Sequence, residues 1–197
     1  MTTVSDLAVV VLAGGEGSRI GGGKPLVMLG ENTLVERALE RARAWSNRTV
    51  VSLRSADQVG QLGLPWIDDA PGIEGPLAGL VSALEWARGQ GANGLLTIPC
   101  DMPFLPDELP QRLVAGIGEM GAAIAASGGN LHPVCGLWRT AALAEVPTYC
   151  TSGQRSLRGF ARHIGFAEVE WPAEPLDPFF NINSPADLAA AEALLVG

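Results

Sequence analysis

The chain has 197 residues, a formal net charge of -8 and 47% hydrophobic residues. This length and apolar content suit a single large core, so we expect residues 1–197 to form one domain. The acidic charge argues against nucleic acid or an anionic membrane as a partner, because their phosphates would repel it. No apolar run approaches the roughly 20 residues that a membrane span needs. The three cysteines lack C-x-x-C spacing, which favours the reducing cytoplasm as the location.

A glycine-rich loop follows the first apolar run. Residues 9–12 are rich in Val, as in a strand buried on both faces, and they lead into residues 14–23, which combine repeated glycines with Arg19. Glycine lets backbone N–H groups approach an anion closely, and Arg19 and Lys24 can neutralise its charge. Because Pro25 follows Lys24, the spacing is not G-x-x-x-x-G-K-[ST], and it fits G-x-G-x-x-G poorly. We interpret the loop as a phosphate cradle, with a tight surface turn as the alternative.

The segment after this loop predicts a helix and then a strand. Thr33 and Glu36 have the spacing of a capping box, which predicts a helix over residues 34–45. Residues 49–53 predict the second strand. Such a βαβ unit implies parallel strands that are joined by a right-handed crossover.

Acidic residues follow two further predicted strands. Residues 64–67 predict a short third strand that ends before Asp69, and residues 94–98 predict a fourth that ends before Asp101. Between them a helix is predicted to begin near Pro76, since proline is favoured at the first helical position. In open α/β sheets the ligand crevice lies beyond the carboxyl ends of the strands. We therefore expect the glycine-rich loop, Asp69 and Asp101 to meet at one edge of the sheet.

The rest of the chain continues this alternation. The expected elements are a helix over residues 106–117, a strand over 122–126, a turn and strand over 130–138, a helix from 152 to about 163, and a last helix that is capped by Ser184 and Asp187 and ends near 195. The whole pattern predicts an α/β protein, a three-layer Rossmann-like fold with a mostly parallel sheet and helices on both faces.

Asp101 is the strongest candidate for a metal ligand. It lies at a strand terminus between Pro99 and Pro103, which restrict the backbone and aim the carboxylate. Mg²⁺ is typically held by one or two carboxylates together with substrate phosphates, and Mn²⁺ is the alternative ion. A cap for the following helix is the other interpretation of Asp101.

Phosphate binding, a divalent metal and the lack of an obvious nucleophile together indicate nucleotidyl transfer. An acceptor phosphate or hydroxyl would attack the α-phosphate of a nucleoside triphosphate in line. Mg²⁺, Lys24 and Arg19 would neutralise the charge that develops on the departing pyrophosphate. Such chemistry depends on positioning more than on a covalent residue.

Several motifs, taken in order, resemble a known family. They are Leu12-Ala13-Gly14-Gly15 followed by Arg19 and Lys24, Asp69 before Gly75-Pro76-Leu77-Ala78-Gly79, Pro99-Cys100-Asp101-Met102-Pro103, His132-Pro133, and Asn181-Ile182-Asn183-Ser184-Pro185-Ala186-Asp187-Leu188. This set spans nearly the whole chain and resembles the molybdenum cofactor guanylyltransferase (MobA) family of the nucleotidyltransferase superfamily. The resemblance implies transfer of GMP from GTP to the terminal phosphate of Mo-molybdopterin, which yields the guanine dinucleotide cofactor and pyrophosphate.

The resemblance also implies a role for each matching residue. The expected nucleotide-binding residues are Leu12, Ala13, Gly14, Gly15, Lys24, Ser52, Asp69 and Asp101. The expected catalytic residues are Arg19, Lys24 and Asp101, with Asp101 as the Mg²⁺ ligand. On the pterin side the expected residues are Asn181, Asn183, Arg155 and Arg158, and a solvated helix face is the alternative for the two arginines. The substrates would be GTP and Mo-molybdopterin, with transient docking to a protein that delivers molybdopterin or matures molybdoenzymes.

Guanine is the expected base. Residues 12–15 read Leu-Ala-Gly-Gly where the cytidylyl branch of the superfamily usually has Leu-Ala-Ala-Gly, and that branch lacks the segment seen here at residues 75–79. Two positions depart from the family pattern: Gly23 stands where Asp is frequent, and Ser52 stands where many relatives have an Asn-containing turn. The alternatives are a molybdopterin cytidylyltransferase, a sugar-phosphate nucleotidylyltransferase of the same fold, and a non-catalytic molybdopterin carrier.

Three further residues are assigned no catalytic role. Cys100 is expected to be a buried small thiol and not a nucleophile. His132 is either a substrate contact or a turn histidine bonded to the backbone. His163 is expected to place a favourable charge at a helix C-terminus.

Overall fold

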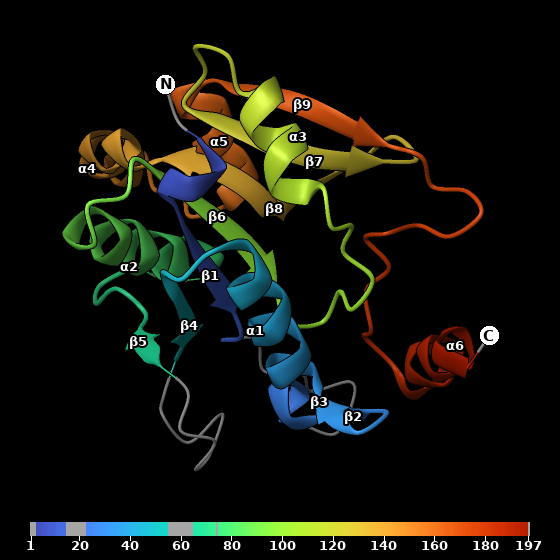
Figure 1. Cartoon of the computed structure of the whole chain (residues 1–197). Coiled ribbons are helices and arrows are strands. Elements are labelled where there is room, and N and C mark those ends of the chain that lie inside the picture. Colours follow the sequence, from blue (N-terminus) through green and yellow to red (C-terminus); the bar gives the residue numbers. More distant parts are fainter. Residues whose placement is uncertain (1–2, 15–22, 55–64, 74, 197) are drawn as a thin grey trace.

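The sheet at the centre of the protein is mixed but mostly parallel (Figure 1). The computed structural model describes residues 3–14, 23–54, 65–73 and 75–196. These residues form a seven-stranded sheet in the order β5-β4-β1-β6-β8-β7-β9. Its strands are β1 (Leu7–Leu12), β4 (Thr49–Leu53), β5 (Trp66–Asp68), β6 (Gly94–Pro99), β7 (Ala122–Ser127), β8 (Asn130–Arg139) and β9 (Phe166–Trp171). Only β8 runs antiparallel to its two neighbours in this sheet, β6 and β7.

Helices cover both faces of the sheet. On one face lie α1 (Leu34–Trp45) and α3 (Leu109–Gly116), and on the other lie α2 (Pro76–Gly89), α4 (Val146–Thr151) and α5 (Leu157–Ile164). Successive residues of a strand point to opposite faces. Accordingly, Val9 and Val11 of β1 belong to the core beneath α1, whereas Val10 belongs to the core beneath α2. The expected three-layer α/β fold is confirmed.

A smaller unit combines an early β-ribbon with the last helix. A two-stranded ribbon of β2 (Met28–Leu29) and β3 (Asn32–Thr33) packs against α6 (Pro185–Val196), and Leu29, Ile182 and Ala191 share one apolar cluster. Short 3-10 helices cover Val4–Asp6, Lys24–Leu26 and Thr140–Glu145. No helix in the described part of the chain has both the length and the apolar character that a membrane crossing requires.

Local sequence signals located several elements to the residue. Helix α1 and strand β4 have the expected bounds, and the predicted capping box is present, since Thr33 and Glu36 exchange hydrogen bonds. The helix expected from residue 106 begins instead at Leu109. Pro110 explains this shift: proline has no N–H to donate, so it must lie in the first turn of a helix.

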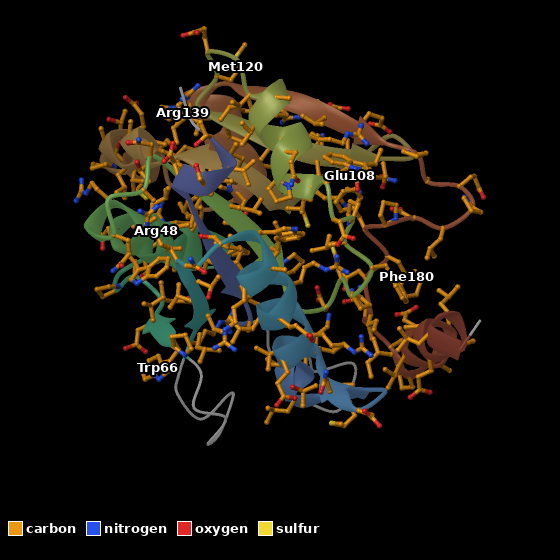
Figure 2. All side chains as sticks on the ribbon, viewed as in Figure 1. Arg48, Trp66, Glu108, Met120, Arg139 and Phe180 are labelled. Carbon is orange, nitrogen blue, oxygen red and sulfur yellow. The ribbon has the colours of Figure 1, made fainter. Side chains whose placement is uncertain are left out.

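Other elements were missed or shifted. Strand β9 and helix α4 were not predicted, and β5 ends one residue later than expected, at Asp68. Trp66 of β5 is 41% exposed at the edge of the sheet and is labelled in Figure 2. The predicted start of that strand at residue 64 lies outside the described residues.

A bulge interrupts β8 close to the carboxyl end of β6. The ladder with β7 jumps from the pair Ile124–Gly136 to the pair Ala125–His132, so residues 133–135 have no ladder partner on β7. Bulges of this kind redirect side chains and often occur beside active sites. Here the bulge directs Val134 into the cleft described next.

Candidate active site

A cleft of about 220 Å³ opens at the carboxyl ends of β1, β4, β5 and β6. Its lining residues are Leu12, Ala13, Gly14, Lys24, Pro25, Ser52, Arg54, Asp69, Gly75, Pro76, Gly79, Pro99, Cys100, Asp101, Val134 and Asn181. The strand ends are joined there by backbone hydrogen bonds, from Ala13 N to the Ser52 carbonyl (3.0 Å) and from Cys100 N to the Leu12 carbonyl (3.3 Å). The sheet therefore gathers, at one edge, residues that are distant in sequence.

Lys24 is a buried cation of this cleft, and its ammonium has several partners. It follows Gly23, whose φ of 60° is a left-handed conformation that glycine adopts readily. Its ammonium forms an ion pair with Asp101 Oδ2 and donates to Asn183 Oδ1 at 2.7 Å and more weakly to Asn181 Oδ1 at 3.5 Å. Lys24 is only 8% exposed. This arrangement fixes a positive charge at the floor of the cleft.

Asp101 has one satisfied and one unsatisfied oxygen. Oδ2 pairs with Lys24, whereas Oδ1 is buried and has no hydrogen-bond partner. The backbone of Asp101 is held by a bond from Ile182 N to its carbonyl (2.9 Å). A buried acceptor without a partner is costly and rare, but such an oxygen is a suitable ligand for a hard cation. Asp101 therefore fits the Mg²⁺ ligand that the sequence predicts.

No cluster of three or more His, Cys, Asp or Glu that could hold a metal is found in the described part of the chain. A Mg²⁺ ion at Asp101 would thus have to take most of its ligands from water and from the phosphates of a bound substrate. This is the usual arrangement in phosphoryl-transfer sites, because Mg²⁺ keeps several waters and dehydrates reluctantly.

A second carboxylate, Asp69, forms the opposite wall. Ser52 Oγ donates to Asp69 Oδ1 at 2.9 Å, and Asp69 N donates to the Leu53 carbonyl at 3.0 Å. Burial raises the pKa of Asp69, while the Ser52 hydrogen bond and the charge of Arg54 partly oppose the rise. The side chain is therefore a half-buried acceptor that lines the cleft.

Two glycines make room for this wall. A Cβ on Gly79 of α2 would lie 2.9 Å from Ser52 Oγ and 3.2 Å from Asp69 Oδ1, closer than packed atoms allow. A Cβ on Gly14 would lie 3.3 Å from Arg54 Cγ and 3.5 Å from Asp69 Oδ2. The close approach of α2 to Ser52 and Asp69 thus depends on the absence of a side chain at residue 79, whereas a Cβ at residue 14 would be in tight contact with Arg54.

Comparison with known proteins identifies the family. The model of the MobA-like NTP transferase domain matches residues 9–169. The chain belongs to this family. Like the other MobA-like proteins, it is therefore a nucleotidyltransferase, and its cleft is the candidate active site.

Curated relatives and solved structures agree with this MobA-like assignment. Proteins named molybdenum cofactor guanylyltransferase from Cereibacter sphaeroides and Sinorhizobium fredii are 39% and 40% identical to this chain. Each alignment covers 94% of this chain, and 95% and 90% of the respective relative. A crystal structure of molybdopterin-guanine dinucleotide biosynthesis protein A from Archaeoglobus fulgidus superposes with a TM-score of 0.75 at 28% identity, covering 96% of this chain and 98% of that one.

The MobA-like cleft contains most of the nucleotide-binding residues that were predicted from the sequence. Leu12, Ala13, Gly14, Lys24, Ser52, Asp69 and Asp101 all line it. Gly15 and Arg19 lie outside the described residues. Three further lining residues, Pro25, Arg54 and Val134, were given no role from the sequence. Arg54 directly follows the predicted second strand, so its position at a strand end was an available signal.

The four residues expected on the pterin side divide into two pairs. Asn181 and Asn183 contact Lys24, so they lie beside the predicted phosphate-binding group. Arg155 donates to the carbonyls of Cys150 and Gln154, and Arg158 is exposed on α5. Neither arginine lines the cleft.

Three candidate side chains remain: Cys100, His132 and His163. Cys100 is buried, and burial raises the pKa of its thiol, so it is a poor nucleophile, as expected. His132 bonds to the Ser127 side chain at 2.8 Å and not to the backbone. Burial lowers the pKa of His132, while the charges of Asp177 and Glu170 partly oppose this change. His163 lies in the last turn of α5, as expected, and pairs with Glu145.

A separate cavity of about 340 Å³ lies between α1 and the residues that follow β6. Its lining includes Arg37, Arg41, Met102 and Leu105, and it shares Cys100 with the cleft. It contains neither Lys24 nor the carboxylates of Asp69 and Asp101. The nucleotidyltransferase chemistry is therefore assigned to the smaller cleft.

Proposed function

We propose that this protein is a Mg²⁺-dependent molybdenum cofactor guanylyltransferase, which transfers GMP from GTP to the terminal phosphate of Mo-molybdopterin and releases pyrophosphate. The observation that carries the proposal is the pairing of Lys24 with one oxygen of Asp101 while the other oxygen is buried without a partner. This pair lies in a cleft whose opposite wall is Asp69. Relatives named molybdenum cofactor guanylyltransferase are 39% and 40% identical over most of the chain.

The reaction in this proposal is an in-line displacement. An oxygen of the acceptor phosphate forms a bond to the α-phosphorus of GTP. The bond that breaks joins this phosphorus to the oxygen that bridges the α- and β-phosphates. The electron pair leaves with pyrophosphate. A divalent ion supplies Lewis-acid polarisation of the α-phosphate and charge neutralisation. Asp101 would hold that ion, and Lys24 would donate to the phosphates on which negative charge develops.

Lys24 must change partners for this to happen. Its ammonium is engaged by Asp101, Asn181 and Asn183, and an ammonium has three hydrogens to donate. Negatively charged phosphates are better acceptors for an ammonium than neutral amides are. We propose that the two asparagines keep Lys24 near its working position and that GTP phosphates replace part of this set.

The wall around Asp69 would receive the nucleoside. Guanine and ribose both present N–H or O–H donors, and a carboxylate is an acceptor only. Gly14 is compatible with a purine, since the absence of a Cβ leaves room in the cleft beside Arg54 and Asp69. The fold itself does not choose the base: 4-diphosphocytidyl-2C-methyl-D-erythritol synthase from Anaerococcus prevotii superposes with a TM-score of 0.75 at 13% identity, a likeness of fold alone.

The proposal extends to the setting of the reaction. Residues 1–197 would form one nucleotidyltransferase domain that works in the cytoplasm, in line with three free thiols at Cys100, Cys135 and Cys150. The net charge of -8 supports a protein that has no nucleic-acid or membrane partner. Transient docking to a protein that delivers molybdopterin or matures molybdoenzymes completes the proposal.

The test is pyrophosphate release from GTP, CTP, UTP and ATP, each with MgCl₂, MnCl₂ or EDTA, and each with Mo-molybdopterin, with a sugar phosphate or without an acceptor. We expect release only from GTP, only with the pterin, and only with a divalent ion. Preference for CTP would assign the protein to the cytidylyl branch. Release with a sugar phosphate as the acceptor would make it a sugar-phosphate nucleotidylyltransferase. No release under any condition would favour a molybdopterin carrier.

A further inference from the structure

The acceptors of Lys24 come from a part of the chain without regular structure. Asn181 and Asn183 lie between Asp177 and Ser184, a segment with neither helix nor strand that leads to α6. Phe180 of this segment is labelled in Figure 2. The colours of Figure 1 show that the segment follows late in the sequence, whereas Lys24 lies between β1 and β2, near the start of the chain. Backbone ladders do not fix such a segment, so its side-chain contacts must place the two amides.

A directed chain of hydrogen bonds anchors the start of this segment. Asp177 Oδ1 accepts from Phe179 N and from Ser127 Oγ, both at 2.9 Å. A carboxylate has no hydrogen to give, so the single hydroxyl hydrogen of Ser127 points to Asp177. Ser127 Oγ also lies 2.8 Å from His132 Nε2, and it can only accept there. His132 therefore donates through Nε2–H, and the chain runs from His132 through Ser127 to Asp177.

The His132 ring makes a second contact with the same segment. It stacks on the Phe179 ring at 4.6 Å between centroids and 15° between planes. Trp171 also packs against Phe179, with 5.4 Å between ring centroids and 77° between ring planes. Phe179 is only 2% exposed, so its ring is almost completely enclosed. Two residues later the amide of Asn181 reaches Lys24.

The segment is then fixed a second time beside the reacting groups. Ile182 is fully buried, and its N–H donates to the carbonyl of Asp101. Asn183 N and Ser184 N both donate to Asp187 Oδ2 at the start of α6. The two asparagines are therefore held between two anchors, one that contains His132 and one at the first turn of α6.

We propose that His132 is a positioning residue for nucleotidyl transfer, which through Ser127 and Phe179 fixes residues 177–183 so that Asn181 and Asn183 hold Lys24 beside Asp101. The inference rests on the proposed function for its kinetic consequence. It assigns no contact between His132 and the substrate.

Two substitutions separate the contributions of the ring. His132→Phe keeps an aromatic ring for the stack and removes the N–H donor, whereas His132→Gln keeps an N–H donor and removes the ring. The matched controls are His163→Phe and His163→Gln, because His163 is the other histidine of the chain and pairs with Glu145 outside the cleft. Ser127→Ala removes the middle of the hydrogen-bond chain and replaces the His132 variants if these do not fold.

The first readout does not depend on activity. Amide hydrogen exchange reports how often the Ile182 N–H leaves the Asp101 carbonyl. We expect exchange of residues 179–183 to rise about tenfold in both His132 variants and to stay unchanged in both His163 variants. Unchanged protection in the His132 variants would overturn the proposal, whatever reaction the protein catalyses.

The second readout is a double-mutant cycle with Asn183→Ala. Contacting residues of one network show non-additive effects, whereas independent sites combine multiplicatively in rate. We expect His132→Phe to lower kcat/KM about tenfold in the wild-type background and less than about twofold in the Asn183→Ala background. An equal loss in both backgrounds would show that His132 acts apart from the Lys24 contact. If the wild-type protein released no pyrophosphate from GTP, the proposed function would fail while the exchange experiment still decided the positioning role.

Discussion

The two carboxylates of the cleft are held in opposite ways. Asp69 bonds to a neutral hydroxyl, that of Ser52, and burial raises its pKa. Asp101 pairs with the ammonium of Lys24 through one oxygen and leaves its other oxygen buried and unpartnered. The same residue type, after β5 in one case and after β6 in the other, therefore has two different environments. The difference indicates two tasks: Asp69 suits the acceptance of hydrogen bonds from a nucleoside, and Asp101 suits the binding of a cation.

Replacement of Asp101 should have the largest effect. Asp101→Asn keeps the size of the side chain but removes the negative charge that a metal ion and Lys24 require. We expect kcat to fall about 10³-fold, ~4 kcal/mol in activation free energy, with the fold intact. The measurement is GTP turnover alongside thermal unfolding. Asp107→Asn is the control, because Asp107 is an exposed carboxylate that pairs with Arg41 away from the cleft, and its turnover should not change. Retention of more than a tenth of wild-type turnover in Asp101→Asn would remove Asp101 from the mechanism.

Replacement of Lys24 tests the ion pair from its other side. Lys24→Met leaves the Asp101 carboxylate buried without its cation, which is expected to cost about 3 kcal/mol of unfolding free energy and about 10²-fold in kcat/KM for GTP. Added MgCl₂ should then raise the melting temperature of Lys24→Met more than that of the wild type, because the ion replaces the missing charge.

The control for this prediction removes both charges. Lys24→Met combined with Asp101→Asn should recover part of the lost stability and lose the response to MgCl₂. A melting temperature of Lys24→Met that does not respond to MgCl₂ would contradict the assignment of Asp101 as a cation ligand.

Substitution of Gly79 perturbs the wall of Asp69 without touching Asp101. The Cβ in Gly79→Ala would push on Ser52 and Asp69, so we expect KM for GTP to rise about tenfold with a much smaller change in kcat. Gly89→Ala on the same helix is the matched control, because no atom lies within 4 Å of its Cβ. It should leave KM unchanged and stabilise the protein slightly, by ~0.5 kcal/mol. Equal KM values for the two variants would mean that this wall does not contact the nucleotide.

The smallest expected effect is on pH dependence. The raised pKa means that folded Asp69 takes up a proton at a higher pH than an unfolded Asp does, so its protonation favours the folded state as the pH falls. GTP binding should weaken over the same range, since a protonated carboxyl is a poorer acceptor. Ser52→Ala removes a bond that lowers the pKa, so the rise in KM should begin at a higher pH, with an effect of a few-fold at most at neutral pH.

The measurement is KM for GTP against pH in the wild type, Ser52→Ala and Asp69→Asn. The Asp69→Asn profile should be flat in this region. An unshifted profile in Ser52→Ala would show that another group controls the acid limb.

Much of the cleft could be predicted because parallel strands impose a simple geometry. Once residues 9–12, 49–53 and 94–98 are recognised as parallel strands, the residues that follow each of them must lie at one edge. The same reasoning predicted that the glycine-rich loop, Asp69 and Asp101 meet at this edge, and the structure confirms that Gly14, Asp69 and Asp101 line one cleft.

The contacts of Asn181 and Asn183 with Lys24 had no such signal. They belong to a segment without helical or strand periodicity, and its position depends on single contacts such as the burial of Ile182 and the stack of Phe179 on His132. Strand β9 was not predicted from the sequence for a related reason. Its glutamates alternate with apolar residues, but it lies at the sheet edge beside β7, which was itself recognised only from small residues. Long-range pairing of this kind is a tertiary property that local sequence does not encode.

The hydrogen bond between Lys24 and Asn183 joins residues that are 159 positions apart. During translation, the β1–α1–β4 unit can form early because its contacts are close in sequence. The lysine, by contrast, finds its acceptors only after nearly the whole polypeptide has left the ribosome. A nascent or prematurely terminated chain therefore carries the glycine-rich segment and Lys24 but lacks the two amides that accept from this lysine, so the contacts of Lys24 are completed only with the last part of synthesis.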